Sequence, residues 1–234
     1  MPASRSAFLR GVKGSAPFAI VIVPFGLLFG VVATEAGLNI VEVMTFSIMV
    51  IAGAAQFAAI QMMLDDAPTI IVLATALAVN MRMAMYSAAL TPHLGAAPLR
   101  MRAVMAYFLV DQTYAAASVE YERRPQQTLA EKIGFFFGAV APVCPLWYVA
   151  TYAGARLGTA IPPEFALDFA VPITFLAIIA PMLRTAAHIA AAATSIALAL
   201  LLAFLPYNTG LLVASLGAML TGAGVEIRTQ GKRG

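Results

Sequence analysis

APFAIVIVPFGLLFGVVAT, residues 16–34, runs for nineteen positions without a charged side chain. A bilayer core about 30 Å thick is crossed by a helix of roughly 20 apolar residues. The stretch is too long for the apolar region of a cleavable signal peptide, although Arg5, Arg10 and Lys13 precede it. It therefore predicts a retained first membrane helix behind a basic segment at residues 1–15.

The rest of the 234-residue chain has the same character. Hydrophobic residues make up 62% of it, charged residues only 11%, and the net charge is +3. About a quarter of the residues of an ordinary soluble domain are charged. So few charges cannot cover a soluble globule, which excludes a water-soluble enzyme, a disordered chain and a nucleic-acid-binding protein. The composition predicts an all-α integral membrane protein, with the lipid bilayer as its surroundings.

Apolar segments of membrane-spanning length recur along the whole chain, with only brief linkers between them. We expect a polytopic helical bundle of about eight transmembrane helices, or seven if the short last segment does not span, in a single domain over residues 1–234. The predicted spans are 16–34, 42–63, 68–91, 102–120, 132–153, 166–183, 187–205 and 209–226.

The positions of lysine and arginine predict the orientation of these spans. With eight spans and a cytoplasmic N-terminus, ten basic residues face the cytoplasm and three, Arg100, Arg102 and Arg156, face outward. Cytoplasmic loops of membrane proteins carry an excess of Lys and Arg. We therefore expect the basic segment at 1–15 and the basic tail at 227–234 to be cytoplasmic.

A short motif recurs in the first and fifth predicted spans. FGLLFGVVA at 25–33 resembles IGFFFGAVA at 133–141, and both place small residues four positions apart, which lets helices approach closely. Internal duplication is common in secondary transporters. Chance recurrence of Gly and Phe in apolar helices gives the same pattern, so an internal repeat and coincidence are both open.

Arg82 is the side chain that a membrane tolerates least, because a charged residue at the middle of a span costs about 2.5–3.5 kcal/mol on insertion scales. Asp111 in the next predicted span is the expected counter-ion. The two residues lie at equal depth if the consecutive spans are antiparallel neighbours. The pair either locks two helices together or forms a charge centre on a substrate or proton path. Tyr86 lies on the same helix face as Arg82.

Two amides lie in the same apolar surroundings. Gln56 follows the small residues Gly53, Ala54 and Ala55, which leave room for close packing or for a ligand. Its amide offers both donors and acceptors to that space. Asn80 is either a ligand group or a hydrogen-bonding link between helices.

Prolines at 24, 142 and 145 interrupt two of the predicted spans. Each removes one backbone donor and displaces a helical hydrogen bond. In transporters, broken helices free backbone groups for ligands near the middle of the membrane. We expect helix breaks at Pro24, Pro142 and Pro145, with simple packing kinks as the alternative.

Metal and nucleotide chemistry find no support in the sequence. Cys144 is the only cysteine, and His93 and His188 share no ligand spacing. No phosphate-binding glycine motif is present. An intramembrane enzyme would need a convergent set of His, Asp and Glu near an interface. We therefore expect no metal, no cofactor and no enzymatic activity.

Three motifs, in their order and spacing, resemble those of the AzlC-type branched-chain amino acid permeases. The resemblance covers about residues 8–205, including the opening stretch at 11–37. The motifs are AGAAQF at 52–57, Asn80-Met81-Arg82 with Tyr86, and DQTYA at 111–115.

The resemblance implies proton-coupled export of branched-chain or other apolar amino acids across a bacterial inner membrane, together with a small AzlD-type membrane subunit. The family often has His where this chain has Met83, and an acidic residue where it has Gln112. The alternative is a non-transporting subunit or passive channel with a structural Arg–Asp pair. The implied site residues are Gln56, Asn80, Arg82, Tyr86 and Gln112 for substrate binding and Asp111 for proton coupling.

Overall fold

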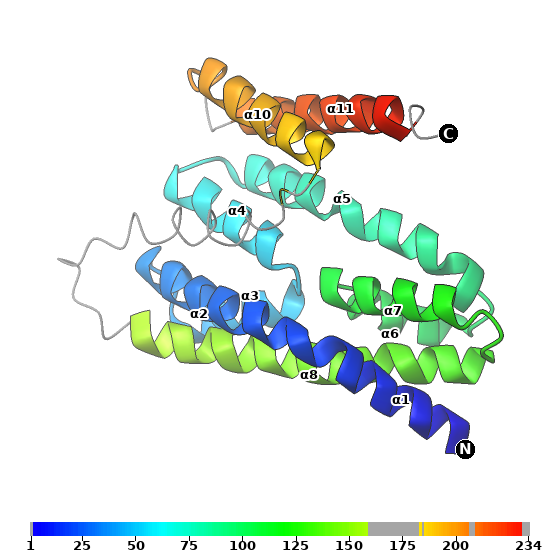
Figure 1. Cartoon of the computed structure of the whole chain (residues 1–234). Helices are drawn as coiled ribbons and strands as arrows, with labels where there is room; N and C mark the ends of the chain where they lie inside the picture. The colour runs from blue at the N-terminus through cyan, green and yellow to red at the C-terminus, as the bar shows by residue number, and fades with distance from the viewer. Residues whose placement is uncertain (1, 159–182, 184, 206–208, 231–234) are drawn as a thin grey trace. The chain divides into compact units, whose positions relative to one another are not determined.

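The computed structural model describes residues 2–158, 183, 185–205 and 209–230, and all the secondary structure in these ranges is helical. The all-α prediction is therefore confirmed. The helices are α1 (Pro2–Ser15), the 3-10 helix η1 (Ala16–Phe18), α2 (Ala19–Glu35), α3 (Ile40–Met49), α4 (Gly53–Leu64), α5 (Thr69–Leu94), α6 (Leu99–Tyr107), α7 (Asp111–Arg123), α8 (Leu129–Gly158), α10 (Ala186–Leu201) and α11 (Gly210–Gln230) (Figure 1).

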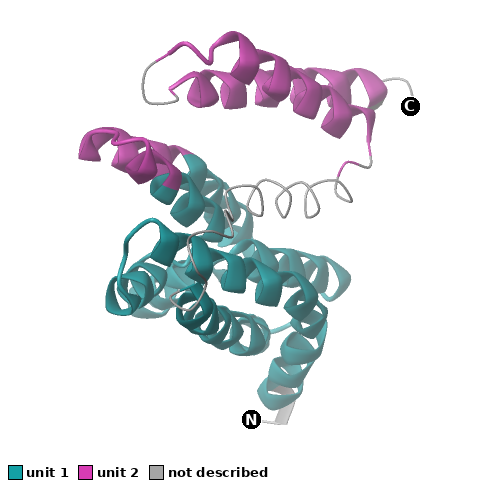
Figure 2. Cartoon of the chain, turned by 90° about the vertical axis from the view of Figure 1, so that its left-hand side faces the viewer, with its two compact units in different colours: residues 1–60, 79–162 teal, residues 61–78, 163–234 magenta. Residues whose placement is uncertain are grey.

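The chain separates into two compact units (Figure 2). Unit 1 comprises residues 1–60 and 79–162, and unit 2 comprises residues 61–78 and 163–234. The single transmembrane domain over residues 1–234 stays a prediction.

Fewer helices are long enough to span a membrane than the sequence predicts. Within the described ranges, four meet the length and hydropathy of a span, and three other apolar helices are shorter. The span predicted at 166–183 lies outside the described residues, apart from residue 183. The four long helices are Ser4–Glu35, Thr69–Leu94, Leu129–Gly158 and Gly210–Thr229.

In unit 1, α8 lies beside α1 and α2 and runs in the same direction (Figure 1). Gly134 near the start of α8 lies against Ser4, and Gly158 at its end lies against Thr34. Later residues of α8 therefore contact later residues of the α1–α2 segment, as in two parallel helices. The two helices that carry the recurring glycine motif, α2 and α8, are therefore parallel.

Glycines let these helices touch backbone to backbone. Gly30 of α2 lies against the carbonyl of Thr151, and Gly154 of α8 lies against the carbonyl of Leu27. A Cβ atom at either position would collide with the facing backbone. Small residues at such crossings are what allow membrane helices to pack closely.

The predicted second span, 42–63, is two helices and not one. Residues 50–52 between α3 and α4 are not helical. Phe46 of α3 and Phe57 of α4 both pack against Phe29 of α2, at ring-centroid distances of 5.9 and 5.5 Å. The two helices thus pass the same level of α2 in opposite directions, so α3 and α4 form a hairpin that turns inside unit 1.

The predicted fourth span, 102–120, is broken in the same way at residues 108–110. Side chains of α7 contact those 28 or 29 positions earlier on α5, so these two helices run parallel. The prediction of antiparallel neighbours is wrong, because α6 returns along α5 before α7 begins. The contacting pairs are Arg82 with Asp111, Tyr86 with Tyr114, and His93 with Tyr121.

The α6–α7 hairpin lies wholly within unit 1, and both its ends lie near the start of α8. Arg102 of α6 lines a cavity together with Leu94 of α5 and Phe136 of α8. It therefore lies near the start of α8, and the prediction that Arg102 lies on the opposite membrane face from the start of the fifth span, 132–153, is wrong. The cause is again the break, which turns a predicted crossing into a return.

The α3–α4 turn at 50–52 and the α6–α7 turn at 108–110 meet near the middle of α8. The Tyr107 hydroxyl at the end of α6 donates to the carbonyl of Ile48, at 2.6 Å, and lies 3.3 Å from the hydroxyl of Tyr148 on α8. Beside it, the Trp147 indole N–H donates to the Ser47 hydroxyl at 2.8 Å. The two non-helical segments, 50–52 and 108–110, are thus fixed as neighbours.

The helices are not broken where the prolines predict. Pro24 lies within a continuous α2, and Pro142 and Pro145 lie within a continuous α8. A proline removes only one N–H, and close packing against neighbouring helices can hold a membrane helix together around it. The observed breaks at 50–52 and 108–110 contain no proline.

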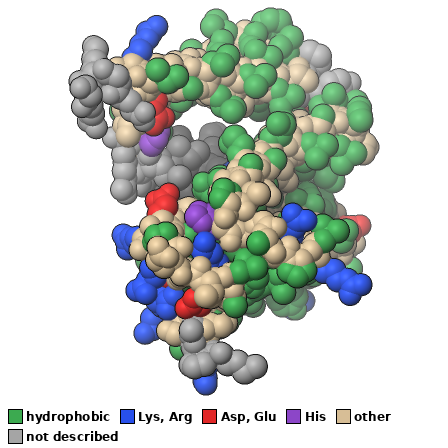
Figure 3. Space-filling view, turned by 90° about the vertical axis from the view of Figure 1, so that its right-hand side faces the viewer, with side chains coloured by type: hydrophobic (Ala, Val, Ile, Leu, Met, Phe, Trp, Pro, Cys, Tyr) green, Lys and Arg blue, Asp and Glu red, His purple; other side chains and the backbone are tan. Residues whose placement is uncertain are grey.

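Basic side chains gather at one end of unit 1 (Figure 3). Glu120 of α7 binds Arg10 of α1 at 3.0 Å and Arg124 at 3.6 Å, and accepts a hydrogen bond from Gln127 at 2.8 Å. The basic segment at 1–15 therefore lies, through Arg10, beside the end of α7, while the basic tail at 227–234 belongs to unit 2. That this end is cytoplasmic stays a prediction.

In unit 2, α10 and α11 pack against each other in opposite directions. Gly217 lies against Leu198, and Gly222 lies against Ala191. These helices correspond to the last two predicted spans. The final one is longer than the sequence suggests, since α11 has 21 residues.

Candidate functional site

The centre of the candidate site is the carboxylate of Asp111. The Arg82 Nη2 atom lies 3.1 Å from its Oδ2 atom, and the Tyr86 hydroxyl donates to its Oδ1 atom at 3.0 Å. Both oxygens of the carboxylate are therefore engaged, one by a cation and one by a neutral donor. The predicted pairing of Arg82 with Asp111 is confirmed, as is the shared helix face of Arg82 and Tyr86.

The backbone around residues 108–110 explains why a carboxylate sits here. Asp111 is the first residue of α7, at the helix end where the dipole and free N–H groups favour negative charge. The Thr113 hydroxyl accepts a hydrogen bond from the Val110 N–H at 2.9 Å and lies 3.1 Å from the Phe108 carbonyl. The break is thus a capped helix start that presents Asp111 toward α5.

Tyr86 is held in place by an aromatic stack. Its ring lies 4.1 Å from that of Tyr114, centroid to centroid, with 9° between the two planes. Tyr114 is one turn beyond Asp111 on α7, so the stack and the hydrogen bond fix the same pair of helices. A carboxylate held by Arg82 and Tyr86 can exchange a proton or bind a cationic group. When the carboxylate loses its charge, its attraction to Arg82 is lost.

Gln56 lies at the other break, in the first turn of α4. Its side chain is fully buried, and neither Nε2 nor Oε1 has a hydrogen-bond partner among the described residues. Asn80 and Arg82 on α5 also each have one buried polar atom, Oδ1 and Nε respectively, that has no partner in the part of the chain that the structure describes. Buried polar groups in proteins nearly always have partners. These atoms are thus donors and acceptors available to a ligand.

Gln112 is the predicted residue that the structure leaves apart from these contacts. It is half-buried on α7, and its side chain makes no hydrogen bond with another described residue. The structure neither joins Gln112 to the Arg82–Asp111 pair nor gives it another role.

Two residues of the site region were missed from the sequence. Tyr107 links the two breaks through its hydroxyl, and Tyr114 orients Tyr86. Aromatic residues are common in apolar helices, so Tyr107 carries no sequence signal. Tyr114 lies within the DQTYA motif, and that motif was the available signal.

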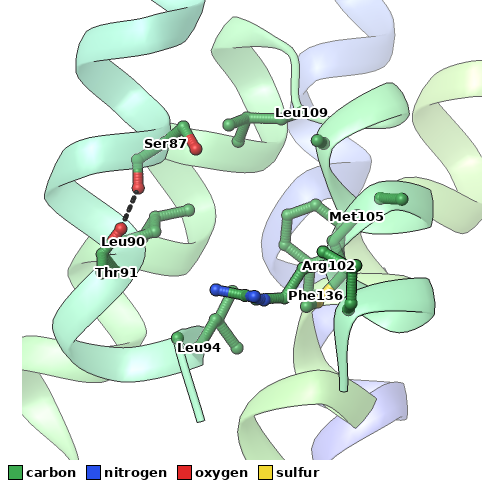
Figure 4. A pocket seen from close by; sticks show the side chains of 12 residues that line it. Ser87, Leu90, Thr91, Leu94, Arg102, Met105, Leu109 and Phe136 are labelled. Carbon is green, nitrogen blue, oxygen red and sulfur yellow. Dashed lines mark hydrogen bonds between the residues drawn. The ribbon is translucent and has the colours of Figure 1, made fainter. Parts of the chain in front are cut away.

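A cavity of about 360 Å³ lies a turn or two from Tyr86, between the last turns of α5 and helix α6 (Figure 4). Its walls include Leu90, Leu94, Met105 and Phe136, and the guanidinium of Arg102 points into it. The size falls within the range of small-molecule sites. Within the described ranges, no group of His, Cys, Asp and Glu could hold a metal ion.

The family model of the AzlC protein matches residues 17–161. This match spans α2 to α8 and includes both breaks and the Arg82–Asp111 pair. The chain belongs to the AzlC family.

Two relatives extend the AzlC match. The chain is 29% identical over 183 residues to the inner membrane protein YgaZ of Escherichia coli, covering 75% of this chain and 73% of that protein. It is 29% identical over 228 residues to an uncharacterized membrane protein of Archaeoglobus fulgidus, covering 94% of this chain and 96% of that protein. No solved structure matches the chain significantly. This AzlC-family chain is a membrane protein related to transport.

Proposed function

We propose that this AzlC-family chain is a secondary active transporter, and not an enzyme, that exports branched-chain or other apolar amino acids across the inner membrane with the proton gradient as driving force. The observation that carries the proposal is the Asp111 carboxylate, held by Arg82 and Tyr86 at a helix break. Ionisable residues inside membrane proteins are costly and typically mark substrate or proton paths.

The geometry suggests how a proton could be coupled to movement. While Asp111 is charged, it holds α7 to α5 through Arg82 and Tyr86. Protonation removes the charge of the carboxylate, so the attraction to Arg82 is lost and the two helices are free to separate. Met83 stands where the family often has a histidine, so the proposal assigns proton coupling to Asp111.

The apolar part of the substrate would bind against aromatic side chains beside the α3–α4 turn. Phe25, Phe57 and Trp147 lie together there, with ring centroids 4.9 Å apart for Phe25 and Phe57 and 6.0 Å for Phe25 and Trp147. Such a wall selects apolar side chains but separates a single methylene by only about 1–3 kcal/mol. We therefore propose a class of related amino acids as substrates.

A small AzlD-type membrane subunit is the proposed partner. A passive channel, in which the Arg82–Asp111 pair only locks helices, is the competing account. Cells loaded with dipeptides of leucine, isoleucine and valine, expressing the chain with or without the subunit, test the proposal. We expect efflux of the freed amino acids that a proton uncoupler stops. Efflux that is unchanged by the uncoupler supports the passive channel. Absence of efflux both with and without the subunit contradicts the proposed substrate class.

A further inference from the structure

The first turn of α4 is a helix start with no acceptor of its own. Ala52 precedes it with only a methyl group, and Gly53, Ala54 and Ala55 form the turn. The Gln56 N–H donates to the Ala52 carbonyl, so the three N–H groups before it have no helical partner. Among the described residues, none accepts a hydrogen bond from them. The turn is partly buried, since Ala52 is 7% exposed and Ala55 is fully buried, while Gly53 and Ala54 are half-buried.

Gln56 adds a second, independent observation at this turn. Its amide is fully buried, and neither of its polar atoms has a hydrogen-bond partner within the described ranges. Side chains on a helix tilt toward the helix N-terminus, so the Gln56 side chain leans back toward the first turn of α4. A buried donor without a partner is costly unless something binds to it. The backbone N–H groups and the Gln56 Nε2 are thus unpartnered donors of the same helix start.

The start of α7 carries different side chains. Its first residue has a carboxylate, Asp111, and the Thr113 hydroxyl accepts a hydrogen bond from the Val110 N–H. The first turn of α4 carries neither a carboxylate nor a hydroxyl, and Gly53 lies against the rings of Phe25 and Trp147. Helix starts of this kind are ready-made sites for anions.

We propose that the first turn of α4, with Gln56, binds the carboxylate of the transported amino acid. The inference rests on the proposed transport function and deepens it. It assigns the carboxylate of the substrate to the break at 50–52 and leaves the other end of the substrate to the break at 108–110. The carboxylate lies on α4, and Arg82 stays with Asp111 instead of receiving the substrate. The two breaks are neighbours through the Tyr107–Ile48 hydrogen bond, so one small molecule can face both. The site therefore requires a free carboxylate.

Binding measurements on the purified full-length chain in nanodiscs test this assignment. We expect L-leucine to bind, and L-leucinamide, which lacks the carboxylate, to bind at least about tenfold more weakly. Gln56→Glu places a second carboxylate in the turn, so it should weaken leucine binding by at least about tenfold. Gln61→Glu makes the same chemical change at an exposed position of the same helix and should leave binding unchanged.

The outcomes separate the inference from the proposed function. If leucine and leucinamide bind equally to the unaltered chain, the carboxylate site is wrong while transport of apolar amines or amino acids stands. The same holds if Gln56→Glu binds leucine normally. If no apolar amino acid binds the unaltered chain, the proposed substrate class fails and the carboxylate site fails with it. The leucinamide comparison needs no variant, so it holds even if Gln56→Glu does not fold.

Discussion

Arg82 and Asp111 lie 3.1 Å apart, on two helices that run parallel although only a short segment of chain separates them. The two helices can run parallel because α6, which lies between them in the chain, runs back along α5 before α7 begins. The ion pair therefore joins α7 to α5 next to residues 108–110, the non-helical segment between α6 and α7. Loss of the pair would release the tip of this hairpin and leave its base in place.

The energetic coupling of the pair can be measured in a double-mutant cycle. Arg82→Gln and Asp111→Asn should each lower the thermal stability of the detergent-solubilised protein, and the double variant should lose less than the sum. Because the two side chains are 30% and 40% exposed, we expect a coupling energy on the order of 1 kcal/mol. Additive losses would show that the two charges do not interact.

The two stacked tyrosines offer a matched comparison. Tyr86→Phe removes the hydroxyl that binds Asp111 but keeps the ring on Tyr114, so transport should fall about 5- to 10-fold. Tyr114→Phe keeps the same stack, and its hydroxyl makes no hydrogen bond with a described residue, so transport should change less than about twofold. Initial efflux rates at equal expression measure both. Equal effects of the two substitutions would contradict the role given to Tyr86.

The hairpin of α6 and α7 makes a prediction about membrane sidedness. Cys144 is the only native cysteine, so a Cys144→Ser background allows single cysteines to be placed at Ala96, Gln126 and Val41. We expect a membrane-impermeant maleimide to reach Ala96→Cys and Gln126→Cys from the same side, and Val41→Cys from the other. Labelling of positions 96 and 126 from opposite sides would mean that residues 102–120 span the membrane.

The backbone contact between α2 and α8 should be sensitive to a single methyl group. Gly154→Ala pushes a Cβ against the Leu27 carbonyl, and overpacking of this kind costs about 1–3 kcal/mol. Gly224→Ala is the control, because nothing lies within 4 Å of the added atom. Thermal unfolding should show a loss for Gly154→Ala and no loss for Gly224→Ala. Equal midpoints would place the close contact elsewhere.

The sequence predicts the charged pair well and the path of the chain poorly. Arg82 and Asp111 stand out because charges are rare in apolar segments, and a membrane forces such residues to find each other. Phe108, Leu109 and Val110 are as apolar as any helix, so hydropathy cannot tell a spanning helix from two half-length ones. The assumption that Arg82 and Asp111 lie at equal depth on antiparallel spans therefore gives the right partner for Arg82, although the two helices run parallel.

The same limit applies to the second break and to the prolines. Gly53 and the alanines after it suggest close packing, but nothing in Val50 and Ile51 signals the end of a helix. Pro24 and Pro142 give the clearest local signal, yet tight packing against a neighbouring helix overrides it. Tertiary contacts decide where these helices break, and single-sequence patterns do not contain them.

The central claim is that Asp111 couples a proton gradient to amino-acid movement. Proteoliposomes containing the chain and its small membrane subunit, with an imposed pH gradient and labelled leucine, test it most directly. We predict accumulation against the leucine gradient by the unaltered chain. We predict that Asp111→Asn abolishes this accumulation although it still inserts into the membrane, with no more than the modest loss of thermal stability expected for the broken ion pair. Accumulation by Asp111→Asn equal to that of the unaltered chain would contradict the account.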